Sequence, residues 1–251
     1  MNETPPHAAL SASELTALNR DFYDALWGQA RLVAPDRFNT WPLVDDLVSA
    51  GGSRLEVAPG LRPRLPLQGT CFLDISTQAA RILRGQGCDA TVGLITALPF
   101  ADASFDLVCA FDIVEHVDDD ETALAELARV AANGATFLLS VPLHASAWTA
   151  FDDFVGHRRR YERADLEMKL ARHGFVVERS AIHGMQPKSS RLLDLGMWFL
   201  THQRERAMWW YNRVIMPLGL RSQSALTTAP GWIDDRGVDT VLLLCRRHTR
   251  S

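Results

Sequence analysis

The sequence has few cysteines, no long apolar run and no signal-like start, and each shortage excludes a class of protein. Its four cysteines lack paired C-x-x-C spacing, which argues against a zinc site and against a disulfide framework. No run of about 18 uncharged apolar residues occurs, and residues 1–10 lack a basic start followed by an apolar core. We therefore expect a protein of the reducing cytoplasm, without a membrane span.

Positive charge is not in excess either. The chain carries 26 basic and 30 acidic residues, a formal net charge of −4, so no nucleic-acid partner is expected, because nucleic-acid affinity rests largely on basic surface. With 251 residues and 47% hydrophobic composition, the chain can bury the core of one α/β domain. The expected partner is a small molecule, and a homodimer is compatible with the sequence.

Apolar runs alternate with helical patterns along most of the chain, which predicts a doubly wound, mostly parallel seven-stranded α/β sheet. The clearest helix spans residues 118–132, with Asp118 and Glu121 as its N-terminal box and Asn133-Gly134 as its stop. The expected strands span residues 54–58, 70–74, 90–94, 105–111, 136–141, 175–179 and 238–246.

The chain reads as a single domain with helical additions around this sheet. Ser11 and Glu14 are typical of a capping box for a helix reaching about Leu32, and a second helix follows from Thr40 to Gly51-Gly52. The expected parts are an N-terminal helical cap (1–52), the sheet-forming core (53–185), an aromatic-rich helical insertion (186–237) and the last strand with its tail (238–251).

Three segments end in polar or glycine-containing turns, as happens where an open α/β sheet binds a nucleoside at the carboxyl ends of its strands. They are Arg54-Leu-Glu-Val-Ala-Pro-Gly60, Phe72-Leu-Asp-Ile-Ser76, and Leu98-Pro-Phe-Ala-Asp-Ala-Ser-Phe-Asp-Leu-Val-Cys-Ala-Phe-Asp-Ile-Val-Glu-His116. In this order they resemble the class I S-adenosylmethionine-dependent methyltransferases that act on small molecules. The resemblance implies an enzyme that uses S-adenosylmethionine as its cofactor.

The resemblance assigns cofactor roles to the first two strand ends. Glu56 would anchor the glycine loop and the methionine amino group, and Ala58 and Gly60 would form the loop, where a small residue lets the backbone approach the ligand. Asp74 would bind both ribose hydroxyls, although it could instead cap a helix over residues 77–84. The family pattern G-x-G-x-G is reduced to Ala58-Pro-Gly-Leu-Arg62 here, and two nearby prolines leave room for little more than one helical turn.

The remaining cofactor contacts depart further from the family. Leu94 replaces an acid that meets the adenine amino group, so the resemblance leaves adenine to the side chain of Ile75 and to the backbone of Ile95 and Thr96. Phe111 and Asp112 would lie near the methionine part. A nicotinamide dehydrogenase is the competing interpretation, but the fingerprint G-x-G-x-x-G does not occur in this sequence.

Histidines are the candidate bases for an acceptor that must lose a proton. His116, His144 and His157 each follow a strand that ends at the same rim of the sheet. Of the three, we favour His157 as the base. Because the rim is rich in histidine, we also favour O-methylation over N-methylation. Alternative interpretations remain for each group. The histidines could be exposed or satisfied polar groups, and the aromatic residues Tyr23, Trp27 and Trp41 could be core. The arginine run, Arg158–Arg160 with Arg163, could be a solvated helix start. The candidate acceptor-binding residues are Tyr23, Trp27, Trp148, Phe154, Arg160 and Tyr161.

A metal site is a less favoured alternative. Asp112-x-x-Glu115-His116 is similar to the E-x-x-E-H metal motif of ubiquinone-pathway O-methyltransferases and small-RNA 2′-O-methyltransferases, in which an ion could acidify an acceptor hydroxyl. Asp in place of the first Glu shortens the reach. We expect no metal, with Glu115 structural and His116 lining the cofactor pocket.

Residues 186–237 are the most aromatic part of the chain, with helical spacing and interspersed charges. They could pack as core, line a hydrophobic acceptor pocket, or form a dimer or membrane-surface face; residues 231–237 could act as a mobile lip. The favoured function is methyl transfer to a small, partly apolar metabolite. The alternatives are a non-catalytic or regulatory cofactor-binding protein, or an enzyme that uses the cofactor for other chemistry.

Overall fold

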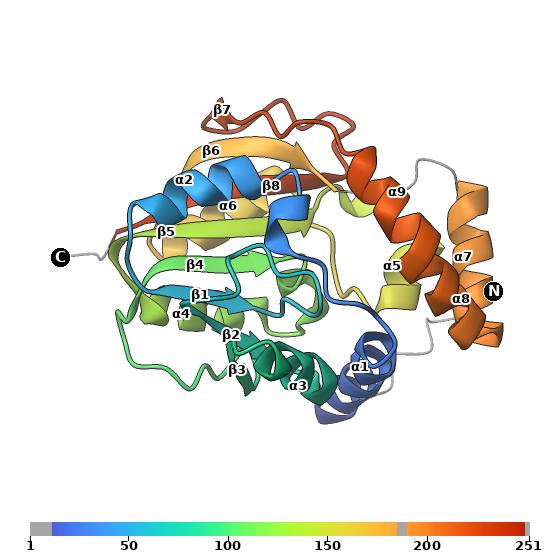
Figure 1. Cartoon of the computed structure of the whole chain (residues 1–251). Helices are drawn as coiled ribbons and strands as arrows, with labels where there is room; N and C mark the ends of the chain where they lie inside the picture. The colour runs from blue at the N-terminus through green and yellow to red at the C-terminus, as the bar shows by residue number, and fades with distance from the viewer. Residues whose placement is uncertain (1–11, 185–189, 249–251) are drawn as a thin grey trace.

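A twisted sheet of eight strands runs through the middle of the molecule, with helices on both of its faces (Figure 1). The computed structural model describes residues 12–184 and 190–248. The strands are β1 (Arg54–Val57), β2 (Thr70–Asp74), β3 (Asp89–Val92), β4 (Phe105–Phe111), β5 (Ala131–Pro142), β6 (Phe175–His183), β7 (Ala229–Pro230) and β8 (Thr240–Arg247).

The strand order is β3-β2-β1-β4-β5-β8-β6-β7. The pairs from β3 to β5 are parallel, whereas β8 lies antiparallel between β5 and β6. This order confirms the doubly wound, mostly parallel sheet, and the expected strands are all present. The additional strand, β7, pairs with Arg179 and Ser180 of β6. The order of the parallel strands reverses between β1 and β4, which is the switch point where open α/β sheets bind ligands.

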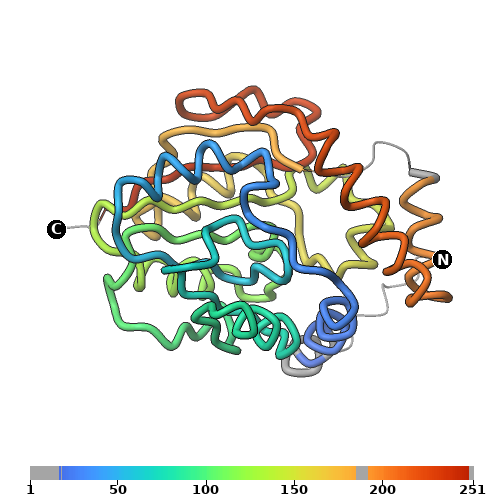
Figure 2. Tube along the Cα trace, viewed as in Figure 1, coloured from blue at the N-terminus to red at the C-terminus, as the bar shows by residue number. Residues whose placement is uncertain are grey.

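The helices are divided between the two faces of the sheet and its carboxyl edge (Figures 1 and 2). In Figure 1, α2 lies in front of the sheet and α4 and α6 lie behind it. Helices α1, α5 and α7 to α9 gather beyond the ends of the parallel strands. The helices are α1 (Ala12–Trp27), α2 (Trp41–Ser49), α3 (Thr77–Gly85), α4 (Asp120–Val130), α5 (Ala150–Val155), α6 (Arg163–Arg172), α7 (Ser190–His202), α8 (Arg204–Trp210) and α9 (Met216–Arg221).

Short helical turns complete the chain path. They are η1 (Pro35–Arg37), η2 (Val114–His116), η3 (Ala145–Ala147) and the π-helical η4 (Tyr211–Ile215) that joins α8 to α9. Among the helices of the described residues, none combines the length and apolar character that crossing a membrane requires.

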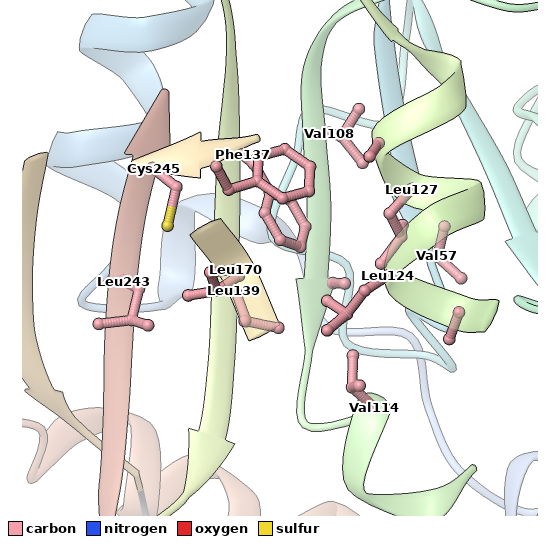
Figure 3. Close-up of a cluster of buried hydrophobic side chains, with 14 of the residues drawn as sticks. Val57, Val108, Val114, Leu124, Leu127, Phe137, Leu139, Leu170, Leu243 and Cys245 are labelled. Atoms are coloured by element: carbon pink, nitrogen blue, oxygen red, sulfur yellow. The ribbon is translucent and has the colours of Figure 1, made fainter. Parts of the chain in front are cut away.

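The main core lies between the sheet and the helices behind it (Figure 3). Leu124 and Leu127 of α4 are three residues apart, so both face the sheet, where they pack with residues such as Val108 and Phe137. All four are fully buried, and burying each such side chain stabilises the fold by about 1.5–3 kcal/mol. This core fixes the strands whose ends carry the candidate site.

The boundaries of α4 differ from the sequence expectation at both ends. The side chain of Asp119, not that of Asp118, caps the helix by accepting from the amide of Thr122. The expected stop at Asn133-Gly134 is wrong, because Ala131 already pairs with Phe105 and therefore belongs to β5. Residues from Ala131 onward are therefore in β5 and not in α4, because they pair with β4.

The N-terminal cap also differs from expectation, whereas the loop after β1 agrees with it. Helix α1 ends at Trp27, well before Leu32, and the predicted Ser11–Glu14 cap falls outside the residues whose side chains the structure describes. The second helix is confirmed as α2, and Gly51 and Gly52 follow it with positive φ. Residues 58–69, all of them described, form turns and contain no helix, which agrees with the expectation that the two prolines leave little room for one.

Candidate functional site

Asp74, at the end of β2, bonds to the loop that follows β1, beside the switch point of the sheet. Its carboxylate accepts hydrogen bonds of 2.8 Å from the backbone amides of Gly60 and Ser76. The side chain is almost fully buried, and this burial raises its pKa to about 6 against the opposing effect of the two amides. Ser76, not Asp74, caps α3, so the helix-cap alternative for Asp74 is replaced by a role in holding the glycine loop.

Glu56 organises the rest of that loop. Its buried carboxylate accepts from the backbone amides of Arg64 and Leu65 at 2.8–3.0 Å. Burial raises its pKa to about 7, although the amides lower it. These bonds satisfy amides that a helix would otherwise use, which explains how residues 58–69 stay ordered without one.

The glycine loop is closed against the N-terminal helix. Ala58 (φ 56°) and Gly60 (φ 53°) both take left-handed conformations. A Cβ atom on Gly60 would collide with the indole of Trp27. The guanidinium of Arg62 lies 5.5 Å from the ring of Trp27 and 4.9 Å from that of Tyr211, so helix α1, the loop and the insertion meet at this point.

The segment predicted to receive adenine is a tight turn. A bridge between Leu94 and Ala97 encloses Ile95 and Thr96. The side chain of Ile95 is 8% exposed and belongs to the core, which leaves only its backbone for a ligand. Thr96 and Ile75 are half-buried.

The end of β4 carries Phe111 and Asp112. Phe111 is half-buried and packs against the cluster beneath α2. Asp112 is exposed and takes a left-handed backbone conformation (φ 49°), and its Oδ1 accepts a 2.7 Å hydrogen bond from the hydroxyl of Ser140.

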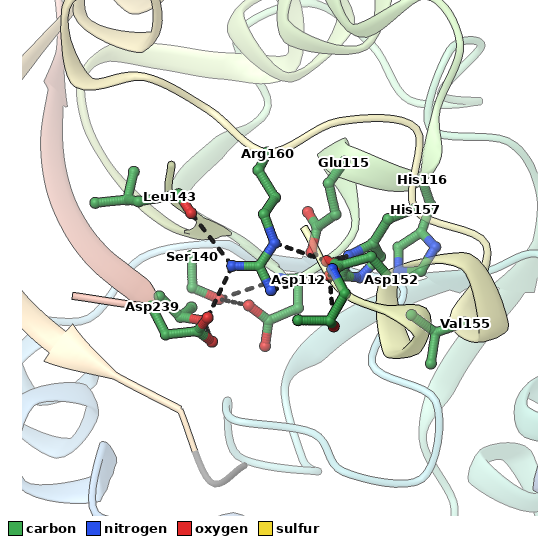
Figure 4. Close-up of polar contacts among 12 residues, drawn as sticks. Asp112, Glu115, His116, Ser140, Leu143, Asp152, Val155, His157, Arg160 and Asp239 are labelled. Atoms are coloured by element: carbon green, nitrogen blue, oxygen red, sulfur yellow. Dashed lines mark hydrogen bonds and ion pairs between the residues drawn. The ribbon is translucent and has the colours of Figure 1, made fainter. Parts of the chain in front are cut away.

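Two of the three candidate histidines come together beside this strand end. The rings of His116 and His157 are 4.6 Å apart between centroids. His157 Nδ1 hydrogen-bonds Asp152 Oδ1 at 2.8 Å, and its Nε2 lies 3.8 Å from Glu115 Oε1 (Figure 4). The hydroxyl of Tyr23 from α1 is 3.4 Å from His116 Nε2, so one cap residue does reach this cluster.

Glu115 is fully buried, and neither of its carboxylate oxygens has a hydrogen-bond partner. Burial, together with the nearby Asp112, holds its pKa well above the usual value. His116 Nδ1 is also buried without a partner, and burial together with neighbouring His157 lowers the pKa of His116 to about 3. Glu115, His116 and His157 each offer a ligand atom, and these atoms lie within 4.8 Å of one another.

Arg160 and Tyr161, which were expected to contact an acceptor, are both buried. Arg160 is paired with Asp152 at 2.8 Å and with Asp239 at 2.7 Å, and it also donates to the backbone oxygen of Leu143 (Figure 4). Tyr161 is 1% exposed, and its hydroxyl donates to Asp120. Both side chains are already fully engaged, so they position other residues, and a solvated arginine run is wrong for Arg160.

His144 and Trp148 do not join the cluster. His144 Nε2 bonds the backbone oxygen of Asp235 at 2.7 Å, which turns it toward the segment before β8. Trp148 is 38% exposed, and its indole donates to Asp153. Neither residue therefore faces His116 and His157 in this structure.

Phe154 instead lines a cleft between α1, α5, α7 and α8, with a volume of about 240 Å³. The rings of Phe22 and Phe154 meet edge to face at 5.9 Å. The residues lining this cleft are Phe22, Leu26, Phe154, Leu200, Thr201 and Arg204.

Sequence reasoning missed Asp152 and most of the cleft. Thr149 and Asp152 form a capping box for α5, a pattern that the sequence does contain, and the same carboxylate binds His157 and Arg160. In the sequence, Phe22, Leu26 and Leu200 show only the apolar spacing of a helix. The same spacing occurs in residues that line a cleft and in residues of the core.

Residues 60–139 match the family model described as a methyltransferase domain. Among curated proteins, ajmaline N-methyltransferase of Rauvolfia serpentina is 34% identical over 80 residues, which cover 29% of this chain and 28% of that protein. The chain spans between 22% and 36% of the length of the curated relatives it matches.

Solved structures share the fold across nearly the whole chain. A protein of Thermotoga maritima described as a possible histamine N-methyltransferase has a TM-score of 0.57 at 17% identity and is covered over 94% of both chains. Phosphoethanolamine N-methyltransferase 2 of Haemonchus contortus, solved with S-adenosylhomocysteine, has a TM-score of 0.56 at 16% identity; the match covers 96% of this chain and 61% of that one. At these identities the similarity shows the fold alone.

Proposed function

We propose that the chain is a class I S-adenosylmethionine-dependent methyltransferase that transfers a methyl group from S-adenosylmethionine to a small, partly apolar acceptor, which the segment matched at residues 60–139 and the fold support. The observation that carries this proposal is the buried carboxylate of Asp74, bonded to the amide of Gly60 in the loop after β1, beside the switch point of the sheet. Open α/β sheets bind nucleosides at this point.

The residues at the rim fit the parts of this cofactor. A carboxylate has about four lone-pair sites, so Asp74 can accept from ribose hydroxyls while it keeps its two amide donors. Glu56 and Asp112 supply acidic groups for the methionine ammonium, and Ile75 with the backbone of Ile95 and Thr96 would receive the adenine. Ala58 and Gly60 would form the loop beside the methionine, and Phe111 an apolar neighbour. When bound, the cofactor supplies a methyl group on a positively charged sulfur.

On the acceptor side, His157 is our candidate base, and its partners support that role. Asp152 bonds Nδ1, which leaves Nε2 free to accept a proton. Asp152 is held by Arg160, and its bonds to His157 and Arg160 keep its pKa below the ordinary value despite its burial. A base that takes a proton during methyl transfer favours a hydroxyl acceptor. His116 and Tyr23 are the neighbouring polar groups.

The cleft beside α1 supports an acceptor with an apolar part. Four of its six lining residues are apolar, and Arg204 gives it one positive charge. Small-molecule sites are usually concave and mostly apolar with a few polar groups that fix orientation. Trp27, which stacks on Tyr23 of the same helix, lies against Gly60 of the glycine loop.

Calorimetry of S-adenosylhomocysteine binding tests the cofactor site. We expect wild type to bind, and Asp74→Ala to weaken binding roughly 10- to 100-fold, because hydrogen bonds to a charged group contribute about 1.5–3 kcal/mol. The matched control is Asp46→Ala, an exposed aspartate of α2. Absence of binding by the folded wild-type chain would contradict the proposal.

A second candidate, a cofactor-binding protein without catalysis, is favoured by Trp27 covering Gly60 in the altered loop. Incubation with methyl-labelled S-adenosylmethionine and a panel of hydroxyl- and amine-bearing metabolites separates the two. Labelled product from an alcohol or phenol would support oxygen transfer, whereas labelled amines would support the nitrogen transfer named for the relatives. Tight binding with no labelled product across the panel would favour the non-catalytic candidate.

A further inference from the structure

Three side chains that can ligate a metal, those of Glu115, His116 and His157, converge beside the turn after β4 (Figure 4). Two of them have buried atoms without a hydrogen bond. Both oxygens of Glu115 and Nδ1 of His116 are buried without a hydrogen bond, and His157 directs Nε2 toward Glu115 at 3.8 Å. A buried carboxylate whose two oxygens accept no hydrogen bond from the protein is costly in its charged form. The cost would be removed by a cation held among the three.

The surroundings of His157 are those of a metal ligand. Asp152 accepts from Nδ1, so the lone pair of the neutral ring lies on Nε2, the atom that faces Glu115. Asp152 is itself fixed by Arg160 and by the amide of Thr149. A carboxylate that orients a ligating imidazole in this way is a recurrent support of metal sites.

From this geometry we propose that Glu115, His116 and His157 bind one divalent transition-metal ion, through a Glu115 oxygen, His116 Nδ1 and His157 Nε2. Two imidazoles and one carboxylate suit Zn²⁺, Mn²⁺ or Fe²⁺ better than Mg²⁺ or Ca²⁺, which prefer oxygen ligands. Ligand atoms about 2.1 Å from a shared ion lie roughly 3 Å apart. The spacing of up to 4.8 Å therefore requires the side chains to close slightly.

Two other accounts of the cluster fit less well. A direct hydrogen bond between Glu115 and His157 would need a distance near 2.9 Å, and the observed 3.8 Å is too long. The set suggested by the sequence motif included Asp112, but Asp112 is bonded to Ser140 and is not one of the three converging ligands. His157, which no local motif joins to Glu115, takes that place.

The chemical role of the ion rests on the proposed function, whereas the binding of the ion by Glu115, His116 and His157 does not depend on that function. In the metal-loaded chain His157 would be a ligand, and the ion would lower the pKa of an acceptor hydroxyl in place of a free base. The reaction would then depend on metal, whereas cofactor binding would keep its main contacts without the ion, because Asp74 ends β2 and Gly60 follows β1, away from the turn after β4.

Metal titration of the EDTA-treated chain tests the site. Mn²⁺ binding is followed by electron paramagnetic resonance, and Co²⁺ by the visible absorption that reports nitrogen ligands. We expect one ion per chain, at least a 10-fold loss of affinity in Glu115→Gln and His157→Gln, and a 10- to 100-fold loss in Asp152→Asn, which weakens the support of His157 and also the ion pair with Arg160. Thermal unfolding in EDTA verifies that each variant is folded.

Two control variants sharpen the result. Asp112→Asn should leave metal affinity within twofold if the converging set is correct, and His144→Gln should do the same because its ring bonds Asp235 elsewhere. Absence of saturable binding by folded wild type, or equal affinity in Glu115→Gln and His157→Gln, would overturn the inference. S-adenosylhomocysteine binding in EDTA, measured on the same sample, shows whether the proposed function stands regardless.

Discussion

Gly60 sits under the ring of Trp27, and this contact connects the glycine loop to the N-terminal helix. Gly60→Ala should destabilise the chain by about 1–3 kcal/mol, because the new Cβ overlaps the indole and φ is 53°. In the double variant with Trp27→Ala, only the backbone strain remains, so the two effects should be less than additive. Urea unfolding of the four chains measures this interaction energy; strictly additive losses would show that the contact is not made.

His183, at the end of β6, should make the fold sensitive to acid. Burial, with a smaller contribution from Arg64, lowers its pKa to about 4, although Asp112 favours the charged form. The unfolded chain binds this proton below pH 6.5 and the folded chain only below about 4. The free energy of unfolding should therefore fall by about 1.4 kcal/mol per pH unit as pH drops through this window.

His183→Asn removes that contribution. Urea unfolding at pH 7.5, 6 and 5 should show the stability of wild type declining relative to the variant as pH decreases. Parallel stability curves would mean that burial does not lower the pKa of His183 in the folded chain relative to the unfolded chain. The comparison is needed because Glu56 and Asp74, whose pKa values are raised, change stability in the opposite direction over part of this range.

Individual residues were predictable where a strand end fixes their position. Glu56, Asp74 and Asp112 lie at the rim of the sheet as expected, because parallel strands end at one edge. The partnership of His157 with Asp152 and Glu115 was not predictable, since it depends on how the segment after β5 folds back over η2. The burial of Arg160 has the same origin.

At the scale of elements, Asp24 of α1 holds the start of α3. Its carboxylate accepts from Ser76 Oγ at 2.5 Å, Thr77 Oγ1 at 2.8 Å and the amide of Gln78 at 3.1 Å. A negative charge at a helix N-terminus satisfies free amides and favours the helix dipole. One element thus caps another across the mouth of the proposed cofactor site.

Asp24→Ala should loosen α1 and cost about 1–2 kcal/mol of stability, the usual range for loss of a helix cap. Hydrogen exchange measured by mass spectrometry should rise in residues 12–27 while β4 and β5 stay protected. The matched control is Asp21→Ala, an exposed aspartate of the same helix. Equal exchange in both variants would mean that these bonds do not hold α1 in place.

The bounds of helices and strands were predicted best where a run of apolar residues is clearly bounded by turn residues. Strands β2 and β4 begin and end at the expected residues, because largely apolar runs bounded by turns define them. The bonds that hold residues 58–69 were not predictable, because they come from Glu56, whose side chain supplies the partners that a helix would have provided. Local sequence does not reveal such a partner.

For the whole molecule, the insertion is tied to the N-terminal part of the chain. Asn212 exchanges two hydrogen bonds with Gln29 and Arg31, and Gln223 does so with Arg37 and Asn39. These contacts join segments about 180 positions apart in sequence. No pattern in either segment predicts them, whereas the sheet order follows from its alternating strands and helices.

The insertion nevertheless presents much apolar surface to solvent, so its contribution to stability should be uneven. Met208 is 2% exposed, whereas the neighbouring Trp210 is 53% exposed. Met208→Ala should lower the free energy of urea unfolding by about 2–5 kcal/mol, while Trp210→Ala should change it by less than about 0.5 kcal/mol. A large loss in Trp210→Ala that varies with protein concentration would instead indicate that this surface is covered by a second copy, because stability then depends on association. If Met208→Ala left the main transition unchanged and melted only the insertion, the helices would be a separate unit whose bonds to residues 29–39 do not transmit stability to the sheet.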